Sequence, residues 1–188
     1  MCKGEDEAVA RQEYAQRGLN VTFVCGHAYL GGFVWSQRLK KAWLEEKVEV
    51  WSRAVETLGA IARHYPQDVH AAVTISLQNE WQYVQRVVLN SAPFFAPLER
   101  AIREHLLPPL LSIHKGDIDG DFRELLGRSI KGGGIGIRNP VDTAPLMFTT
   151  SALATDHLVD SPIDKGVTFE PHLHRKLVER AGDGVKRD

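Results

Sequence analysis

Residues 44–62, LEEKVEVWSRAVETLGAIA, decide the fold class of this 188-residue chain. Apolar side chains recur in this stretch at alternating spacings of four and three residues, which is typical of one apolar face on an α-helix. The members of this face are Leu44, Val48, Trp51, Val55, Leu58 and Ala62. The charged residues Glu45, Glu46, Lys47, Glu49, Arg53 and Glu56 lie between them. The stretch therefore predicts an amphipathic helix that begins near Ser36, buries one side and exposes the other.

A second helical pattern follows after a proline. Pro66 disfavours helical geometry at Tyr65, so the first helix is expected to end before it, and Pro66 suits the first turn of the next helix. The residues predicted to face inward on this second helix are Val69, Val73, Leu77, Trp81, Val84 and Val88.

A third helix is predicted from about Phe94 to Leu107, and Pro108-Pro109 is expected to end it. Its predicted apolar face consists of Phe95, Leu98, Ile102 and Leu106. Amphipathic helices joined by short connections pack against one another as antiparallel bundles. We therefore expect a helical bundle over residues 37–112.

The residues before the bundle predict a β-hairpin. VTFVC (21–25) and YLGGFVW (29–35) are rich in β-branched and aromatic residues, and Gly26-His27 between them is a plausible turn. The hairpin is assigned to residues 21–36. Residues 1–20 form a polar segment with weak helical spacing at 5–17.

The chain becomes irregular after the bundle. Residues 113–160 combine a glycine-rich element with short helices, one of them expected near residues 143–157, and residues 161–188 form a polar tail. The predicted fold class is mainly α: an antiparallel helical bundle with a short N-terminal β-hairpin and an irregular C-terminal part.

Composition excludes few functions. The formal net charge of −1 does not show the basic excess that by itself indicates a nucleic-acid partner, and it does not exclude one. The two cysteines fit a reducing compartment. No apolar run approaches the roughly 20 residues of a membrane helix, and Glu5, Asp6 and Glu7 stand where a signal peptide would be basic and apolar. We expect an intracellular protein, nuclear or cytoplasmic, without a membrane partner.

Two motifs resemble metal sites but lack the required spacing. In the acidic loop 117–121, counting from Asp117 places Phe122 where a calcium loop needs glycine and Arg128 where it needs glutamate, so a turn is expected. His172-x-His174 and the distant Cys25-x-His27 lack the spacing of structural zinc sites. No metal site is predicted, and no nucleophile elbow is present that would indicate catalysis.

The glycine run at 132–136 matches neither nucleotide-binding fingerprint, because Asn139 stands at the third glycine position and no GK[ST] follows. Arg128, Lys131 and Arg138 bracket the run, and residues 125–141 contain no acid. Backbone amides flanked by cations suit a phosphate backbone. A tight packing turn against the bundle is an equal alternative, and the two interpretations are compatible.

Two further polar groups lie elsewhere in the sequence. Arg38, Lys40 and Lys41 form a small basic cluster after the hairpin. The polar residues of the second helix are Gln78, Asn79, Gln82, Gln85 and Arg86, with Tyr83 among them. They either line a groove or face water, and we expect water.

Several segments, in order, resemble the primer-grip and thumb region of a retroelement-type reverse transcriptase. The segments are YLGG (29–32), KVEVW (47–51), PQ (66–67), LQNEWQYVQRV (77–87), PLERAIREHLLPPLL (97–111) and GGGIGIRNP (132–140). The likeness covers roughly residues 20–150. In this family two divalent metals are held by palm carboxylates, including an aromatic-x-Asp-Asp turn before the primer grip. The 28 residues before Tyr29 contain no Asp-Asp pair.

The resemblance implies a module that grips template–primer nucleic acid without catalysing polymerisation alone. It implies an RNA–DNA or DNA duplex partner held by backbone contacts, and a palm-containing polypeptide as a second partner. No cofactor is expected here, because the divalent metal belongs to the missing palm. The residues expected at nucleic acid are Tyr29, Leu30, Gly31, Gly32, Arg38, Lys40, Lys41, Arg128, Lys131, Gly133 and Arg138. The alternative is a small helical protein-interaction module that does not bind nucleic acid.

Overall fold

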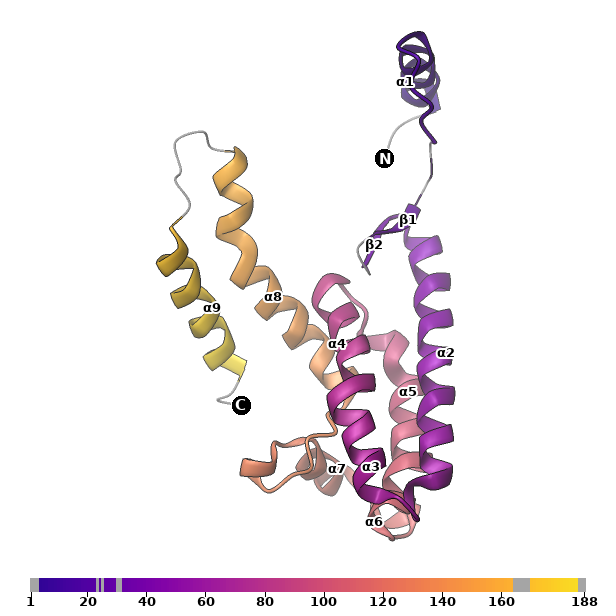
Figure 1. Cartoon of the computed structure of the whole chain (residues 1–188), viewed down its shortest axis with the longest axis vertical. Helices are drawn as coiled ribbons and strands as arrows, with labels where there is room; N and C mark the ends of the chain where they lie inside the picture. The colour runs from indigo at the N-terminus through magenta and orange to yellow at the C-terminus, as the bar shows by residue number, and fades with distance from the viewer. Residues whose placement is uncertain (1–3, 23, 25, 30–31, 164–169, 186–188) are drawn as a thin grey trace. The chain divides into compact units, whose positions relative to one another are not determined.

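The computed structural model of the chain describes residues 4–22, 24, 26–29, 32–163 and 170–185 (Figure 1). These residues form two compact units, 1–43 and 44–188. The first unit contains the helix α1 (Gly4–Gln16), the strands β1 (Gly26–Tyr29) and β2 (Gly32–Trp35), and the start of α2 (Gln37–Ala62). The predicted mainly α fold with a short N-terminal hairpin is confirmed.

The hairpin has a different turn from the one predicted. β1 and β2 pair antiparallel, with Gly26 opposite Trp35 and Tyr29 opposite Gly32. Gly26 therefore starts the first strand, and the connection falls at residues 30–31, outside the described residues. A Cβ on Gly26 would lie 2.9 Å from the ring of Phe33. The prediction of a turn at Gly26-His27 was wrong, because both residues belong to β1.

The second unit is helical, and its elements follow α2 in chain order (Figure 1). They are α3 (Pro66–Ala71), η1 (Ala72–Leu77), α4 (Gln78–Val87), η2 (Ala92–Phe95), α5 (Ala96–Ala101), η3 (Ile102–Leu106), α6 (Leu107–Leu111), η4 (Lys115–Asp117), α7 (Gly120–Gly127), η5 (Ile130–Gly132), α8 (Pro140–Ile163) and α9 (Pro171–Val185). Pro66 lies in the first turn of α3, as predicted.

The core of this unit is built on aromatic rings from three successive helical stretches. Trp51 of α2 lies 6.3 Å from Trp81 of α4 and 6.3 Å from Phe95 of η2, measured between ring centroids. Such pairs contribute about 0.5–1.5 kcal/mol beyond the area they bury. The indole of Trp51 also donates a hydrogen bond to Glu80 at 2.9 Å. The predicted apolar face of α2 is buried except at Leu58, which is half-buried.

The second and third predicted helices each contain one π-helical turn, η1 and η3. A π turn inserts one extra residue per hydrogen-bonded ring and rotates everything after it relative to an α-helical pattern. In the second helix this rotation leaves Leu77 half-buried and turns Gln78 inward. The prediction that Leu77 faces inward was therefore wrong: the next residue, Gln78, is the buried one.

The third predicted helix does not end at the proline pair. Pro108 and Pro109 lie in the first turn of α6, directly after η3, and the helix ends at Ser112, which has a left-handed φ of 56°. Proline is tolerated in a first turn because its missing N–H would have no helical acceptor there. The π turn thus creates a new helical start that accommodates both prolines.

The C-terminal part is more helical than predicted. The helix expected at residues 143–157 extends over Pro140–Ile163 as α8, and the expected polar tail contains α9, which contacts α8. Within residues 171–180, where the burial of α9 is described, His174 and Leu177 are half-buried and the other residues are exposed. Two half-buried positions do not stand out in a polar sequence. None of the helices in the described ranges is long and apolar enough to cross a membrane.

Candidate nucleic-acid interface

The glycine-rich loop that joins α7 to α8 is held by hydrogen bonds from its own backbone and from several helices. α7 begins where Asp119 accepts a hydrogen bond from the amide of Phe122 at 2.8 Å, an N-cap. Asp117 accepts one from the amide of His114 at 3.0 Å. Both aspartates therefore shape a turn and a cap, as predicted for the acidic loop. Arg128 follows the last turn of α7 and starts the glycine-rich loop.

The loop is closed by its own backbone. The consecutive amides from Gly132 to Gly136 all donate to carbonyl groups between Leu126 and Ile130, over 2.8–3.2 Å. Ser129 caps the short turn η5. Gly133 and Gly136 have φ angles of 83° and 75°, a region that favours glycine. A Cβ on Gly134 would lie 2.2 Å from the carbonyl oxygen of Arg128, so no other residue fits there.

Side chains of α3 and α4 hold the second half of the loop. His70 Nε2 lies 2.6 Å from the carbonyl oxygen of Ile135. Gln78 donates to the carbonyl of Gly136 at 3.1 Å and accepts from the amide of Arg138 at 3.0 Å. These side chains bond the backbone as a neighbouring strand would.

Gln85 completes this set at the start of α8. It is fully buried and donates to the carbonyl of Pro140 at 2.7 Å. The expectation that the polar residues of this helix face water is wrong for Gln78, Gln82 and Gln85, which are all buried. Asn79, Tyr83 and Arg86 are exposed, as expected. Burial is possible for Gln78 and Gln85 because the loop backbone satisfies their amides.

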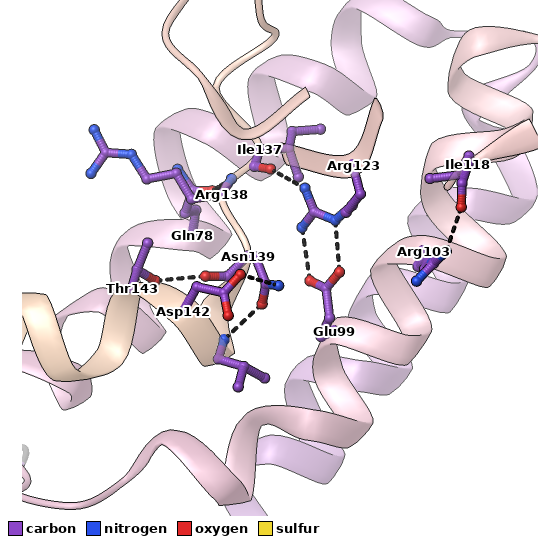
Figure 2. A network of polar contacts seen from close by, with 11 residues as sticks. Gln78, Glu99, Arg103, Ile118, Arg123, Ile137, Arg138, Asn139, Asp142 and Thr143 are labelled. Carbon is purple, nitrogen blue, oxygen red and sulfur yellow. Dashed lines mark hydrogen bonds and ion pairs between the residues drawn. The ribbon is translucent and has the colours of Figure 1, made fainter. Parts of the chain in front are cut away.

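A buried ion pair supports the loop from the other side (Figure 2). Arg123 of α7 donates from Nε and Nη2 to the carboxylate of Glu99 on α5, each at 2.7 Å, and from Nη1 to the carbonyl of Ile137 at 2.8 Å. The Arg123 side chain is 5% exposed and that of Glu99 is 15% exposed. The bidentate geometry fixes the guanidinium in one plane. Ile137, whose carbonyl it binds, is fully buried and anchors the loop in the core.

Asn139 ends the loop and caps α8. Its side chain accepts from the amide of Val141 at 2.9 Å and donates to Asp142 at 2.7 Å. This explains why asparagine occupies the position where a dinucleotide-binding fingerprint requires glycine. No group of three or more His, Cys, Asp or Glu side chains gathers to hold a metal ion among the residues described. Cys25, part of the zinc alternative, lies outside those residues.

The predicted basic residues of this loop are all at its surface. Arg128 is exposed and pairs with Glu124, one helical turn earlier, at 2.8 Å. Lys131 in η5 and Arg138 are exposed, and neither has an ion-pair partner in the described part of the chain. Figure 2 shows the Arg138 side chain pointing away from Gln78 and from the buried ion pair. Only the backbone of Arg138 takes part in the network.

The other predicted site residues belong to the first unit. Tyr29 ends β1 with 64% of its surface exposed, and Gly32 begins β2 and is buried. Leu30 and Gly31 lie outside the described residues. Arg38, Lys40 and Lys41 occupy the first turns of α2, with Arg38 and Lys41 exposed and Lys40 half-buried.

In this loop the backbone and the side chains have different roles. The amides of Gly132–Gly136 and of Arg138 already donate within the protein, so in this conformation they do not form the phosphate cradle that the sequence suggested, and Gly133 serves the turn. The exposed side chains of Arg128, Lys131 and Arg138 are the groups that remain able to contact phosphate. The loop geometry agrees with the interpretation as a tight packing turn. Phosphate binding by the outward cations stays a prediction.

Sequence reasoning missed the residues that position the loop. These are His70, Gln78, Gln85, Glu99 and Arg123. The signal for the glutamines was their place on the helix beside the apolar face, at positions that a π turn rotates inward. The Glu99–Arg123 pair joins residues 24 positions apart, and no local sequence pattern predicts such a contact.

The chain matches no family model, no curated protein and no solved structure in the comparisons made with each. Function is therefore argued from its residues and their geometry.

Proposed function

We propose that this chain is the primer-grip and thumb portion of a reverse transcriptase-like protein and that it holds template–primer nucleic acid by contacts to the phosphate backbone. It is not a polymerase by itself, because its 188 residues include no aromatic-x-Asp-Asp segment to hold catalytic metals. The resemblance of six segments, in order, to that family motivates the proposal.

One observation carries it. Arg128, Lys131 and Arg138 project from a loop whose backbone is fixed by hydrogen bonds, in a stretch without any acid from 125 to 141. A fixed loop holds its cations in place before binding, so less conformational entropy is lost when phosphates arrive. Such contacts carry no sequence preference.

Binding of the full chain to an RNA–DNA duplex, measured across a salt series, tests this function. Each phosphate neutralised contributes about 0.9 to the slope of log affinity against log salt for B-form DNA, and an RNA–DNA duplex is expected to behave similarly. The variant R128A/K131A/R138A is expected to bind more weakly at low salt and to lower the slope by up to about 2.7, which is three contacts at this value.

A charge-matched control removes three exposed cations from other elements of the same unit, Lys47, Arg63 and Lys115, as K47A/R63A/K115A. It has the same net charge and is expected to keep the slope of the unaltered chain. If the unaltered chain does not bind duplex at low salt, the proposal is wrong, and a small helical protein-interaction module becomes the better hypothesis.

A further inference from the structure

An isoleucine stands at the tip of the fixed loop, between two of its cations. Ile130 begins η5 and has 74% of its surface exposed. Arg128 precedes it by two residues and Lys131 follows it directly. Single exposed apolar residues are common and need no explanation by themselves. The setting of Ile130 is what distinguishes it.

The turn that carries Ile130 has little freedom to withdraw it. The carbonyl of Ile130 accepts the amide of Gly133 at 3.2 Å, and the carbonyl of Ser129 accepts the amides of Gly132 and Gly134 at 2.8 and 3.1 Å. The amide of Gly136 also donates to the carbonyl of Arg128 at 2.8 Å, which ties the residues before and after Ile130 together. A loop fixed in this way keeps its apolar tip in water until a partner covers it.

An apolar side chain flanked by cations is complementary to a nucleic-acid groove. The cations face the phosphates along the groove edge, while the apolar group contacts sugars and base edges, and isoleucine is among the residues that act as wedges at base steps. The minor groove of A-form helices is wide and shallow and exposes its base edges, so a short side chain on a turn is able to reach them. Residues 125–141 contain no acid, and the exposed carboxylate next to this stretch, Glu124, is paired with Arg128 at 2.8 Å. Lys131 therefore remains the cation beside Ile130 without an ion-pair partner in the described part of the chain.

We propose that Ile130 is an apolar contact between this loop and the minor groove of a bound RNA–DNA duplex, with Arg128 and Lys131 on the phosphates beside it. This inference rests on the proposed function and deepens it, because it adds a contact that does not depend on charge. It predicts an effect of Ile130 on affinity that salt does not change.

The test compares Ile130→Ser with Ile75→Ser in the full chain. Ile75 lies in η1 and is also 74% exposed, so it matches Ile130 in residue type and exposure. Affinity for an RNA–DNA duplex is measured across a salt series. Ile130→Ser is expected to weaken binding about tenfold at every salt concentration, with an unchanged slope. Ile75→Ser is expected to bind like the unaltered chain, and Lys131→Ala to lower the slope.

A second readout reports on the groove contact directly. A duplex carrying a fluorescent adenine analogue that brightens on unstacking is expected to brighten with the unaltered chain and less with Ile130→Ser. Far-UV circular dichroism and the thermal midpoint should be the same for both serine variants, since neither isoleucine is buried.

The outcomes separate this inference from the proposed function. If Lys131→Ala weakens duplex binding and Ile130→Ser does not, the groove contact is wrong while the phosphate grip stands. If the unaltered chain binds no duplex at low salt, both are overturned. If Ile130→Ser weakens binding to vesicles of anionic lipid and leaves duplex binding unchanged, the tip contacts lipid, and the groove contact is overturned.

Discussion

The side chain of Gln78 makes hydrogen bonds to the loop backbone of the kind that a neighbouring strand would make. Its amide group receives the N–H of Arg138 and donates to the carbonyl of Gly136, so one residue satisfies a donor and an acceptor of the loop. A buried polar group without a partner costs about 1–3 kcal/mol. Gln78 therefore stabilises the loop and also fixes the point from which the Arg138 side chain projects.

We predict that Gln78→Ala lowers the free energy of unfolding by about 1–3 kcal/mol and increases hydrogen exchange at the amide of Arg138. The neighbouring Asn79→Ala is the control, because Asn79 is exposed and its side chain bonds to the carbonyl of Ile75, one turn earlier; its effect should stay within about 0.5 kcal/mol. Urea denaturation and amide exchange measure both. An Arg138 amide that stays equally protected in Gln78→Ala would contradict this role.

The buried glutamines also show where sequence interpretation fails at this scale. A glutamine beside an apolar helical face faces water in most proteins, and its type alone does not reveal a partner 58 residues away. The outward cations were easier to anticipate, because exposure is the default for lysine and arginine.

Among the elements, the apolar faces of the helices could be predicted from the sequence. The rotation of these faces after a π turn could not. The faces through Trp51, Trp81 and Phe95 follow from spacing, and these residues do form the core. The π turns η1 and η3 follow from tertiary packing, which a period of 3.6 residues does not represent. At η3 the backbone comes so close to α2 that a Cβ on Gly59 would lie 2.1 Å from the carbonyl oxygen of His105. Gly59 permits this contact, and its sequence neighbours give no sign of it.

The ion pair of Arg123 with Glu99 links α7 to α5. Removing one partner of a buried pair leaves the other charge without compensation and costs about 3–5 kcal/mol. We predict a loss of this size for Arg123→Leu, because Arg123 also binds the carbonyl of Ile137. The double variant Glu99→Leu/Arg123→Leu should lose less, since no charge remains buried. Chemical denaturation of the single and double variants measures the difference.

The exposed pair of Arg53 with Glu49 provides the matched control for this prediction. It joins residues one helical turn apart on α2, and both side chains are more than half exposed. Arg53→Leu is expected to change stability by less than about 1 kcal/mol. Equal losses for Arg53→Leu and Arg123→Leu would show that burial does not strengthen the Arg123 pair.

For the whole molecule, net charge does not describe how charges are distributed, because it sums over all surfaces. A formal charge of −1 coexists with a stretch of 17 residues, 125–141, that holds three cations and no acid. The sequence predicted this local asymmetry and the bundle. It did not predict that the loop is held by α3, α4 and α7, because those contacts depend on how distant segments meet in the folded unit.

Two basic clusters are predicted at nucleic acid, Arg38, Lys40 and Lys41 in the first unit and Arg128, Lys131 and Arg138 in the second. If both clusters contact phosphates, neutralising either set lowers the salt slope, by up to about 2.7 for three contacts at about 0.9 each. The losses of binding free energy should add in the combined variant, because separate sites without shared partners are close to additive. The variants are R38A/K40A/K41A, R128A/K131A/R138A and the combination of both, with duplex affinity measured from low to physiological salt. An unchanged slope for R38A/K40A/K41A would confine the phosphate contacts to the loop at 128–138. A combined loss much smaller than the sum would mean that the two clusters do not contribute independently to binding.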